Sequence, residues 1–187
     1  DKGMVMARNN FLSLGYYSHL KNTLGELCDK YSENNINILD CGCGEGYYTS
    51  QIKNKCCISD IYGIDISKNA LQYAAKLDKS IKYAVASAFQ LPFASKSSDI
   101  LLNIFAPCAY DEFNRVLNKD GFLVKVVPLS EHLWELKKAI YKEPYKNKPE
   151  IKNDELFVMV DSKELKYNIT LETSEDIFNQ TTKTEKS

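Results

Sequence analysis

The spacing of apolar residues along the chain changes near residue 36. Before that point apolar side chains recur every three or four positions, at Phe11, Leu12, Tyr16, Leu20, Leu24 and Leu27. Such a stripe is typical of a helix that buries one face. Gly15 and Gly25 interrupt the stripe, and glycine inside a helix costs about 1 kcal/mol relative to alanine. The pattern therefore predicts two short N-terminal helices, ending near residue 32, rather than one long helix.

Beyond residue 36, short apolar runs alternate with segments of helical spacing. The runs predict five strands, at residues 36–40, 61–66, 81–86, 99–105 and 122–127. The other segments predict helices at residues 47–53, 68–76, 111–117 and 131–141. Several runs are apolar at every position, as strands buried between two layers of helices must be. The alternation predicts a doubly wound α/β fold around a mostly parallel sheet.

Two later segments predict an antiparallel pair of strands at the edge of this sheet. Residues 157–160 and 165–171 alternate apolar and polar positions around the short turn Asp161-Ser162-Lys163. With this pair the sheet would contain seven strands. We expect one compact unit, in which residues 1–35 form a helical lid on the main domain, residues 36–187.

Composition and charge limit the classes of partner. Lysine and arginine number 24 against 25 acidic residues, a net charge of -1. A domain that binds nucleic acid unaided usually carries a clear basic excess. An RNA substrate would therefore require another module or a local basic patch. No apolar run approaches the roughly 20 residues of a membrane span, and the first residues lack a secretory signal. We expect a cytoplasmic protein that does not contact membranes.

The six cysteines predict no metal site and no disulfide framework. They contain no C-x-x-C pair, and Cys41-Gly42-Cys43 belongs to a glycine-rich turn with a different explanation. Reduced thiols are the ordinary state of cytosolic cysteines.

That turn, residues 41–46, follows the first predicted strand and is the strongest functional signal. Glycines allow the backbone to approach a ligand closely, and Asp40 at the strand end can hold a cation or a hydrogen-bond donor. Glu45 inside the turn would repel a pyrophosphate but suits a ligand that carries an ammonium group and a sulfonium. The residues expected to bind S-adenosylmethionine here are Asp40, Gly42, Gly44, Glu45 and Gly46. The alternative is a purely structural tight turn.

Two further segments are expected to bind the adenosine part of the cofactor. Asp65 ends the second strand about 20 residues after the turn, where an acidic side chain can accept hydrogen bonds from both ribose hydroxyls. Ile66 is next to it, and Ser67 is the expected N-cap of the following helix. After the third strand, Ser87 and Ala88 fall where adenine would lie, with Phe89 or Leu91 over its face. The alternatives are a helix start and simple loop packing.

The segment after the fourth strand supplies the substrate-side candidates. Asn103 is expected to contact the cofactor, whereas Phe105, Pro107 and Cys108 are expected to face the substrate. Proline stiffens this backbone, and an aromatic ring could stack on a flat substrate. No convincing general base follows from the sequence. The candidates near this segment are Cys108, Asp111 and Glu112.

These motifs resemble those of the bacterial large-subunit rRNA guanine-N1 methyltransferases, whose relatives in antibiotic producers confer macrolide resistance. The matching segments are residues 4–8, 11–17, 39–49, 63–68, 85–87, 91–93, 105–108 and 132–141. The glycine turn is shared by many methyltransferases. The opening Ala7-Arg8 with Gly15-Tyr16-Tyr17, the loop Ala106-Pro107-Cys108 and His132 are more specific to this family.

The resemblance implies a Rossmann-like class I methyltransferase that methylates N1 of a guanine in bacterial 23S rRNA. It implies a cofactor pocket that uses Tyr17, Gly44, Glu45 and His132 beside Asp40 and Asp65. The family also carries an N-terminal zinc ribbon and a Met-Thr-Pro segment after the edge strands, and neither is matched in this sequence. Whether a ribbon precedes Asp1, and whether a segment is missing near Gln180, are left open. So is the oligomeric state, with a homodimer as one option.

Two other functions remain open from the sequence. The near-neutral charge favours a methyltransferase for a small metabolite. A third option is a module that binds S-adenosylmethionine without catalysis.

A lysine-rich stretch, formed by Lys137, Lys138, Lys142, Lys146 and Lys148, is expected to be a solvated surface rather than a contact to RNA phosphates.

Overall fold

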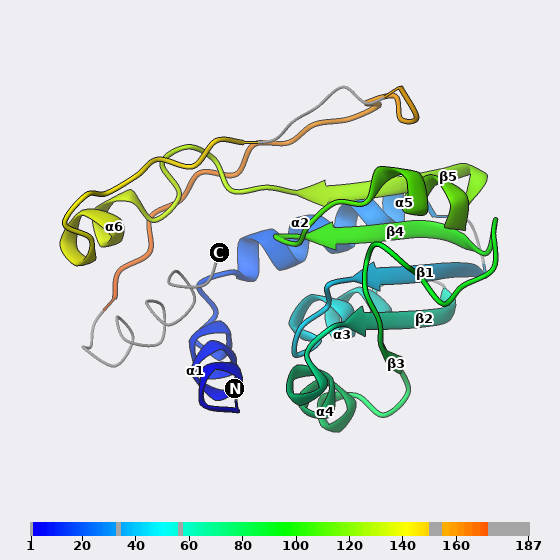
Figure 1. The fold of residues 1–187 in the computed structure, drawn as a ribbon, viewed down its shortest axis with the longest axis horizontal. Helices are drawn as coiled ribbons and strands as arrows, with labels where there is room; N and C mark the ends of the chain where they lie inside the picture. The colour runs from blue at the N-terminus through cyan, green and yellow to red at the C-terminus, as the bar shows by residue number, and fades with distance from the viewer. Residues whose placement is uncertain (1, 33–34, 56–57, 150–154, 172–187) are drawn as a thin grey trace.

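The computed structural model describes residues 2–32, 35–55, 58–149 and 155–171. Two helices, α1 (Lys2–Ser13) and α2 (Ser18–Lys30), precede an alternation of strands and helices (Figure 1). Its elements are β1 (Ile36–Cys41), α3 (Tyr47–Lys53), β2 (Ile58–Asp65), α4 (Lys68–Leu77), β3 (Lys82–Val85), β4 (Ser98–Ile104), α5 (Tyr110–Val116), β5 (Leu117–Val126) and α6 (Trp134–Ile140).

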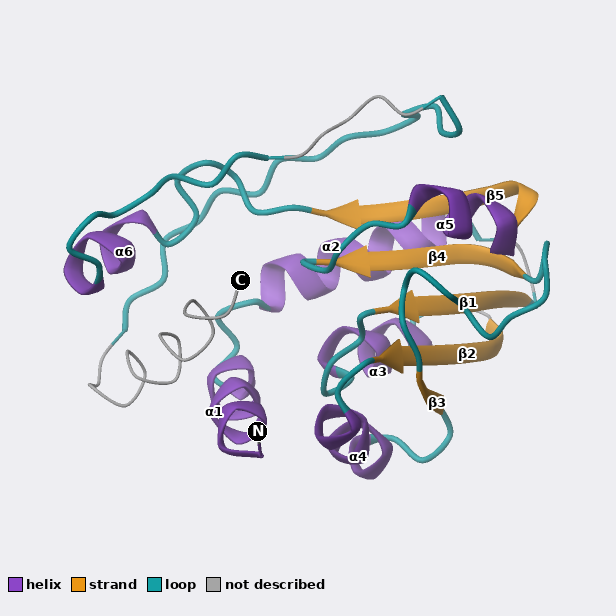
Figure 2. Ribbon diagram, in the orientation of Figure 1, coloured by secondary structure: helices purple, strands orange, loops and turns teal. Residues whose placement is uncertain are grey.

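The five strands form one parallel sheet in the order β3-β2-β1-β4-β5. The chain moves outward from β1 through β2 to β3 and then returns to the other side of β1 with β4. The order therefore reverses between β1 and β4, and ligands of doubly wound sheets bind at the carboxyl ends of the strands beside such a point. In Figure 2, α1 and α6 lie beyond these carboxyl ends.

Each face of the sheet has its own core. Neighbouring strand residues point to opposite faces, so Ile38 and Leu102 enter one core while Leu39 and Leu101 enter the other. Helices α2 and α3 cover the first face, where α1 contributes Phe11 and Leu12 to the same core, and α5 covers the second face. The predicted α/β fold, the parallel strands and both N-terminal helices are thus confirmed.

The last strand begins earlier than predicted, at Leu117 rather than at residue 122. The pairing of β4 with β5 shifts register, because Ser98 pairs with Leu117 whereas Ile100 pairs with Phe122. Residues 118–121 bulge from the ladder between these pairs. A Cβ atom on Gly121 would lie 2.9 Å from the carbonyl oxygen of Asp99, so only glycine fits this close approach.

The expected antiparallel edge pair does not form in the described residues. Residues 155–171 contain no strand, although 157–160 and 165–171 were expected to pair. Instead the segment passes along α2, where Asp161 contacts Lys30 at 2.8 Å and the tilted rings of Tyr167 and His19 lie 5.2 Å apart. Val158, an apolar residue of the first expected strand, is 87% exposed and is not buried as a core-facing strand position would be. The described sheet therefore has five strands rather than seven.

No helix within the described residues has both the length and the apolar character needed to cross a membrane.

Candidate functional site

The glycine turn after β1 is held against the end of β2. The backbone N–H groups of Gly42 and Cys43 both donate to the carbonyl oxygen of Ile64, at 2.8 and 2.9 Å. Gly42, Gly44 and Gly46 have φ angles of +85°, +56° and +79°, which side-chain-bearing residues rarely adopt. The turn lies at the carboxyl edge of the sheet, and the predicted close approach of its glycines to a ligand stays a prediction.

Asp40 is a buried carboxylate beneath this turn. Thr49 of α3 donates a hydrogen bond of 2.5 Å to Asp40 Oδ2, whereas Oδ1 has no hydrogen-bond partner among the described residues. Burial raises the pKa of Asp40 to about 7; the Thr49 hydrogen bond and the charge of Arg8 act in the opposite direction. A buried oxygen without a partner is costly, so this site is suited to a cationic or hydrogen-bond-donating ligand group.

Asp65 connects the turn to the next helix. Its Oδ2 accepts a hydrogen bond from the backbone N–H of Gly44 at 3.0 Å, and its Oδ1 accepts one from Ser67 at 2.8 Å. Ser67 caps α4 by accepting from the backbone N–H of Ala70, as predicted. Each carboxylate oxygen can accept a second hydrogen bond, so these contacts leave capacity for ligand hydroxyls. The neighbouring Ile66 is 78% exposed and offers an apolar surface.

Glu45 is buried within the turn and paired with Arg8, a motif residue to which the sequence assigned no role. Arg8 of α1 places its Nε 2.9 Å from Glu45 Oε1. Neither atom has a hydrogen-bond partner among the described residues. The contact is therefore an ion pair whose alignment does not make it a hydrogen bond. The signal for Arg8 was its place in the Ala7-Arg8 motif, but a motif cannot reveal that α1 folds back onto the turn.

Three aromatic rings from distant parts of the chain meet at the same edge. The hydroxyl oxygen of Tyr17 lies 3.4 Å from His132 Nε2, and the rings of Phe105 and His132 stack with centroids 5.9 Å apart. Tyr17 precedes α2, Phe105 follows β4 and His132 follows β5. Phe105 and Leu133, the residue after His132, have φ angles of +53° and +55°. Such strained backbone is concentrated at functional sites.

The loop after β4 separates the predicted substrate-side residues. Asn103 is buried and its Nδ2 donates to the carbonyl oxygen of Pro107 at 3.0 Å, which closes the loop; Asn103 Oδ1 has no partner among the described residues. Phe105 belongs to the aromatic cluster with Tyr17 and His132. Cys108 instead lines an open groove of about 740 Å³, which does not include that cluster. The residues lining that groove are Phe89, Cys108, Ala109, Tyr110, Asp111, Glu112, Glu155 and Leu156.

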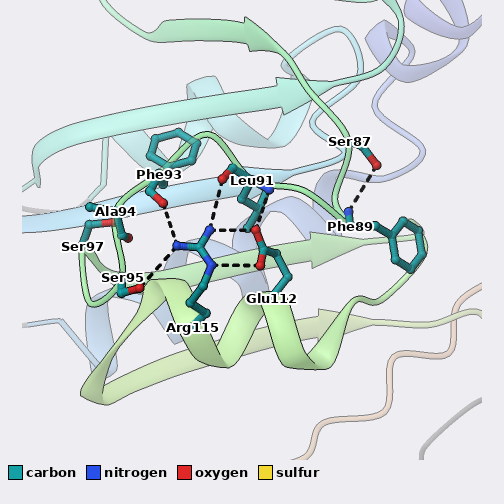
Figure 3. Close-up of polar contacts among 9 residues, drawn as sticks. All are labelled: Ser87, Phe89, Leu91, Phe93, Ala94, Ser95, Ser97, Glu112 and Arg115. Carbon is teal, nitrogen blue, oxygen red and sulfur yellow. Dashed lines mark hydrogen bonds and ion pairs between the residues drawn. The ribbon is translucent and has the colours of Figure 1, made fainter.

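The loop after β3 presents one exposed aromatic ring. Ser87 Oγ accepts a hydrogen bond from the backbone N–H of Phe89 at 3.2 Å, and Figure 3 shows the Phe89 ring directed away from the rest of the loop. Phe89 is 65% exposed, whereas Leu91 is buried in the core beside Leu101. Leu91 therefore cannot cover an adenine ring, and that alternative was wrong. Ile66 and Phe89 are exposed apolar side chains in the loops that follow β2 and β3.

Glu112 is unsuited to the role of general base. Its carboxylate pairs with Arg115 at 2.7 Å and accepts a hydrogen bond of 2.7 Å from the backbone N–H of Leu91 (Figure 3). The Arg115 hydrogen bonds lower the pKa of Glu112 to about 2, which makes it a poor proton acceptor. Its function in this structure is to anchor the loop after β3.

Two cysteines of the glycine turn and one lysine of the lysine-rich stretch are buried. Cys41 and Cys43 are buried, and burial raises the pKa of both thiols, that of Cys41 to about 12. Lys137 is only 3% exposed; it donates to Asn147 Oδ1 at 2.7 Å, and burial lowers its pKa. Lys137 therefore does not belong to the expected solvated surface.

Comparisons with known proteins agree with this geometry. Residues 39–125, from β1 to β5, match a protein family described as a methyltransferase domain. YxjB of Bacillus subtilis (strain 168), whose name assigns it provisionally as a 23S rRNA (guanine-N(1)-)-methyltransferase, is 37% identical over 134 residues, which are 68% of this chain and 47% of that protein. The 23S rRNA (guanine(748)-N(1))-methyltransferase of Streptomyces fradiae is 30% identical over 142 residues, 73% of this chain and 50% of that protein.

The chain thus spans about half the length of the curated relatives that it matches. Among solved structures, the PH0226 protein of Pyrococcus horikoshii OT3 superimposes with a TM-score of 0.57 at 25% identity, over 67% of this chain and 65% of that one. This likeness supports the same fold.

Proposed function

We propose that this chain, whose residues 39–125 match a methyltransferase domain, uses S-adenosylmethionine to methylate N1 of a guanine in bacterial 23S rRNA. The observation that carries the proposal is the meeting of Tyr17, Phe105 and His132 beside the glycine turn. Tyr17 and His132 belong to the motifs through which the chain most specifically resembles the guanine-N1 methyltransferases, and Phe105 directly precedes the Ala106-Pro107-Cys108 loop. Two relatives named for that activity support it.

The residues around the turn fit the cofactor. Asp40 has a buried oxygen that lacks a partner among the described residues, and Asp65 can accept hydrogen bonds from two ribose hydroxyls. We assign Ile66 and Phe89 to the faces of adenine, and Ser87 and Ala88 to its edge. The amino-acid end would lie against Gly42, Gly44 and Gly46, with Tyr17, Asn103 and His132 towards the transferable methyl group. The bound cofactor supplies an electrophilic methyl group on a sulfonium.

The protein's own contribution is position and exclusion of water. In-line displacement needs little from protein side chains beyond orientation of the two reactants. A guanine must leave its stack to reach the site, and aromatic rings such as Phe105 stabilise a base that has been splayed out. The guanine N1 proton must also leave. Asp111 lines the open groove beside Cys108 and, unlike Glu112, forms no ion pair with a described residue. Of the three candidate acceptors near this segment, Asp111 and Cys108 remain, and both line the open groove rather than the aromatic cluster.

Methyl transfer to RNA tests this proposal. The full reading frame that contains the chain is incubated with S-adenosylmethionine and unmodified 23S rRNA, and the product is mapped by blocked reverse transcription. We expect a stop at one guanine, because a methyl group on N1 obstructs Watson–Crick pairing. A protein that binds the cofactor but methylates only small metabolites would contradict the rRNA assignment, and one that methylates neither would be a binding module.

We further propose that residues 1–35 act as a helical lid and that the protein works in the cytoplasm, where its proposed substrate is found. The lid assignment is supported by two contacts from this region to the site, Arg8 to Glu45 and Tyr17 to His132.

A further inference from the structure

Arg8 reaches from α1 onto the glycine turn. Its Nε lies 2.9 Å from Glu45 Oε1, and the Glu45 side chain is only 3% exposed. A Cβ atom built on Gly44 would lie 3.6 Å from both Cζ and Nη1 of Arg8 and 3.7 Å from Nη2. Because three atoms of the guanidinium are nearly equidistant from this point, the flat face of the group lies over Gly44.

This arrangement leaves part of the guanidinium available to a ligand. Glu45 engages the Nε edge, whereas the side chain of Arg8 is 31% exposed. Glu45 is the only described residue that forms an ion pair with Arg8. A guanidinium has five N–H donors in a fixed fork that matches a carboxylate. Its Nη1 and Nη2 can therefore hold a carboxylate while Glu45 fixes the orientation of the whole group.

The positions of the acidic residues indicate which part of the cofactor faces Arg8. Asp65 binds the backbone of Gly44 from the β2 side of the turn and is assigned to the ribose. Asp40 is close enough to Arg8 for the charge of Arg8 to act on it. The opposite end of S-adenosylmethionine carries an ammonium group and a carboxylate. Asp40 complements the ammonium group, and Arg8 complements the carboxylate.

We infer that Arg8 binds the carboxylate of the cofactor's methionine part and that Glu45 acts as a positioning residue for Arg8 instead of contacting the cofactor. This inference rests on the proposed function, since it requires S-adenosylmethionine in the turn. The Arg8 contact gives α1 a direct role in the choice of cofactor, because a ligand without the carboxylate cannot form it.

Calorimetry with two ligands tests the inference without measuring catalysis. The ligands are S-adenosylmethionine and its decarboxylated form, which lacks only the carboxylate. The parent protein should prefer S-adenosylmethionine by roughly tenfold to hundredfold, the range of a hydrogen-bonded charge pair. Arg8→Gln should lose this preference while its affinity for the decarboxylated ligand stays within about twofold of the parent's. Lys2→Gln, an exposed cation on the same helix, should retain the parent's preference.

The role of Glu45 is tested by a double-mutant cycle. Glu45→Gln should weaken S-adenosylmethionine binding in the parent but have little further effect in Arg8→Gln, because both changes remove one coupled contact. Additive effects would mean that Glu45 contacts the cofactor itself and would overturn its positioning role.

Three results separate the remaining possibilities. A parent protein that binds both ligands equally overturns the inference even if Arg8→Gln fails to fold. An Arg8→Gln variant that loses affinity for both ligands equally would show that Arg8 only secures α1. A parent protein that binds neither ligand removes the proposed function, and the inference with it.

Discussion

At the residue scale, burial and partners give four acidic side chains different properties. Asp40 is buried with a raised pKa, Glu45 is buried beside a guanidinium, and Glu112 is held by Arg115 with a lowered pKa. Asp65 accepts one backbone N–H on each oxygen. The residue type alone does not distinguish these cases, because the pKa of a carboxyl group depends on desolvation and on its neighbours.

Asp65→Ala should weaken S-adenosylmethionine binding and lower stability together. We expect a loss of roughly 1–3 kcal/mol in binding free energy, since the ribose hydroxyls lose their acceptor. The free energy of unfolding should also fall by about 1 kcal/mol, because Gly44 and Ser67 lose hydrogen bonds. Calorimetry and urea denaturation measure the two effects. Asp60→Ala, which removes a carboxylate of β2 paired with Lys82, is the control; unchanged cofactor affinity in Asp65→Ala would exclude Asp65 from the site.

Asp40 predicts a specific dependence of stability on pH. The folded protein keeps a proton on Asp40 up to about pH 7, whereas the usual pKa is 3.8. The stabilisation from this protonation is therefore complete below about pH 4 and lost as pH rises to about 7. Across this window the difference in unfolding free energy between the parent and Asp40→Asn should fall by up to about 1.4 kcal/mol per pH unit. Urea denaturation between pH 5 and 8 measures it, and a constant difference would contradict the raised pKa.

At the element scale, one guanidinium attaches the loop after β3 to α5. Arg115 donates to the carbonyl oxygens of Phe93 at 2.8 Å and Leu91 at 3.1 Å while it pairs with Glu112 (Figure 3). No helix connects β3 to β4. These side-chain contacts therefore hold the loop against α5, as a connecting helix packed on the sheet holds the chain elsewhere in a doubly wound fold.

Arg115→Lys should loosen this loop, because an ammonium group cannot replace a planar fork that reaches several acceptors. We expect a loss of about 1–2 kcal/mol in unfolding free energy, discounted for partial exposure, and faster proteolysis within residues 91–97. Urea denaturation and limited proteolysis check both effects. Lys119→Arg, the reverse exchange at an exposed position, should change neither. If Arg115→Lys is as stable and as resistant as the parent, the anchor does not hold the loop.

At the scale of the whole molecule, the N-terminal helices share a core with the sheet. Phe11, Leu20 and Leu24 pack in one cluster with Ile38 of β1 and Ile52 of α3. A lid that only covered the ligand would not need this burial. We therefore expect α1, α2 and the sheet to unfold in one cooperative transition.

Leu24→Ala tests that expectation. Leu24 is 1% exposed, and truncation of a buried leucine costs about 2–5 kcal/mol. The same loss in unfolding free energy should be measured by circular dichroism and by the fluorescence of the single tryptophan, Trp134 of α6. Leu77→Ala, at a position 55% exposed, should cost less than about 0.5 kcal/mol. Separate transitions for the two probes would contradict a single cooperative transition.

The sequence alone determined the parallel α/β architecture and the glycine turn, because both depend on local spacing. Strand and helix periods, and glycines in a left-handed turn, are properties of a few neighbouring residues. Ser67 was likewise identified as a cap from its position before a helix. The resemblance also indicated Tyr17 and His132, which the fold brings within 3.4 Å of each other.

Only the tertiary structure decided the rest. The pairing of Arg8 with Glu45, the burial of Leu91 and the commitment of Glu112 to Arg115 all join residues from different elements. The alternation in 157–171 predicted an edge pair, but a local pattern does not specify its partner, and this segment lies along α2 instead. Side-chain contacts over long sequence separations depend on packing, which local periodicity does not encode.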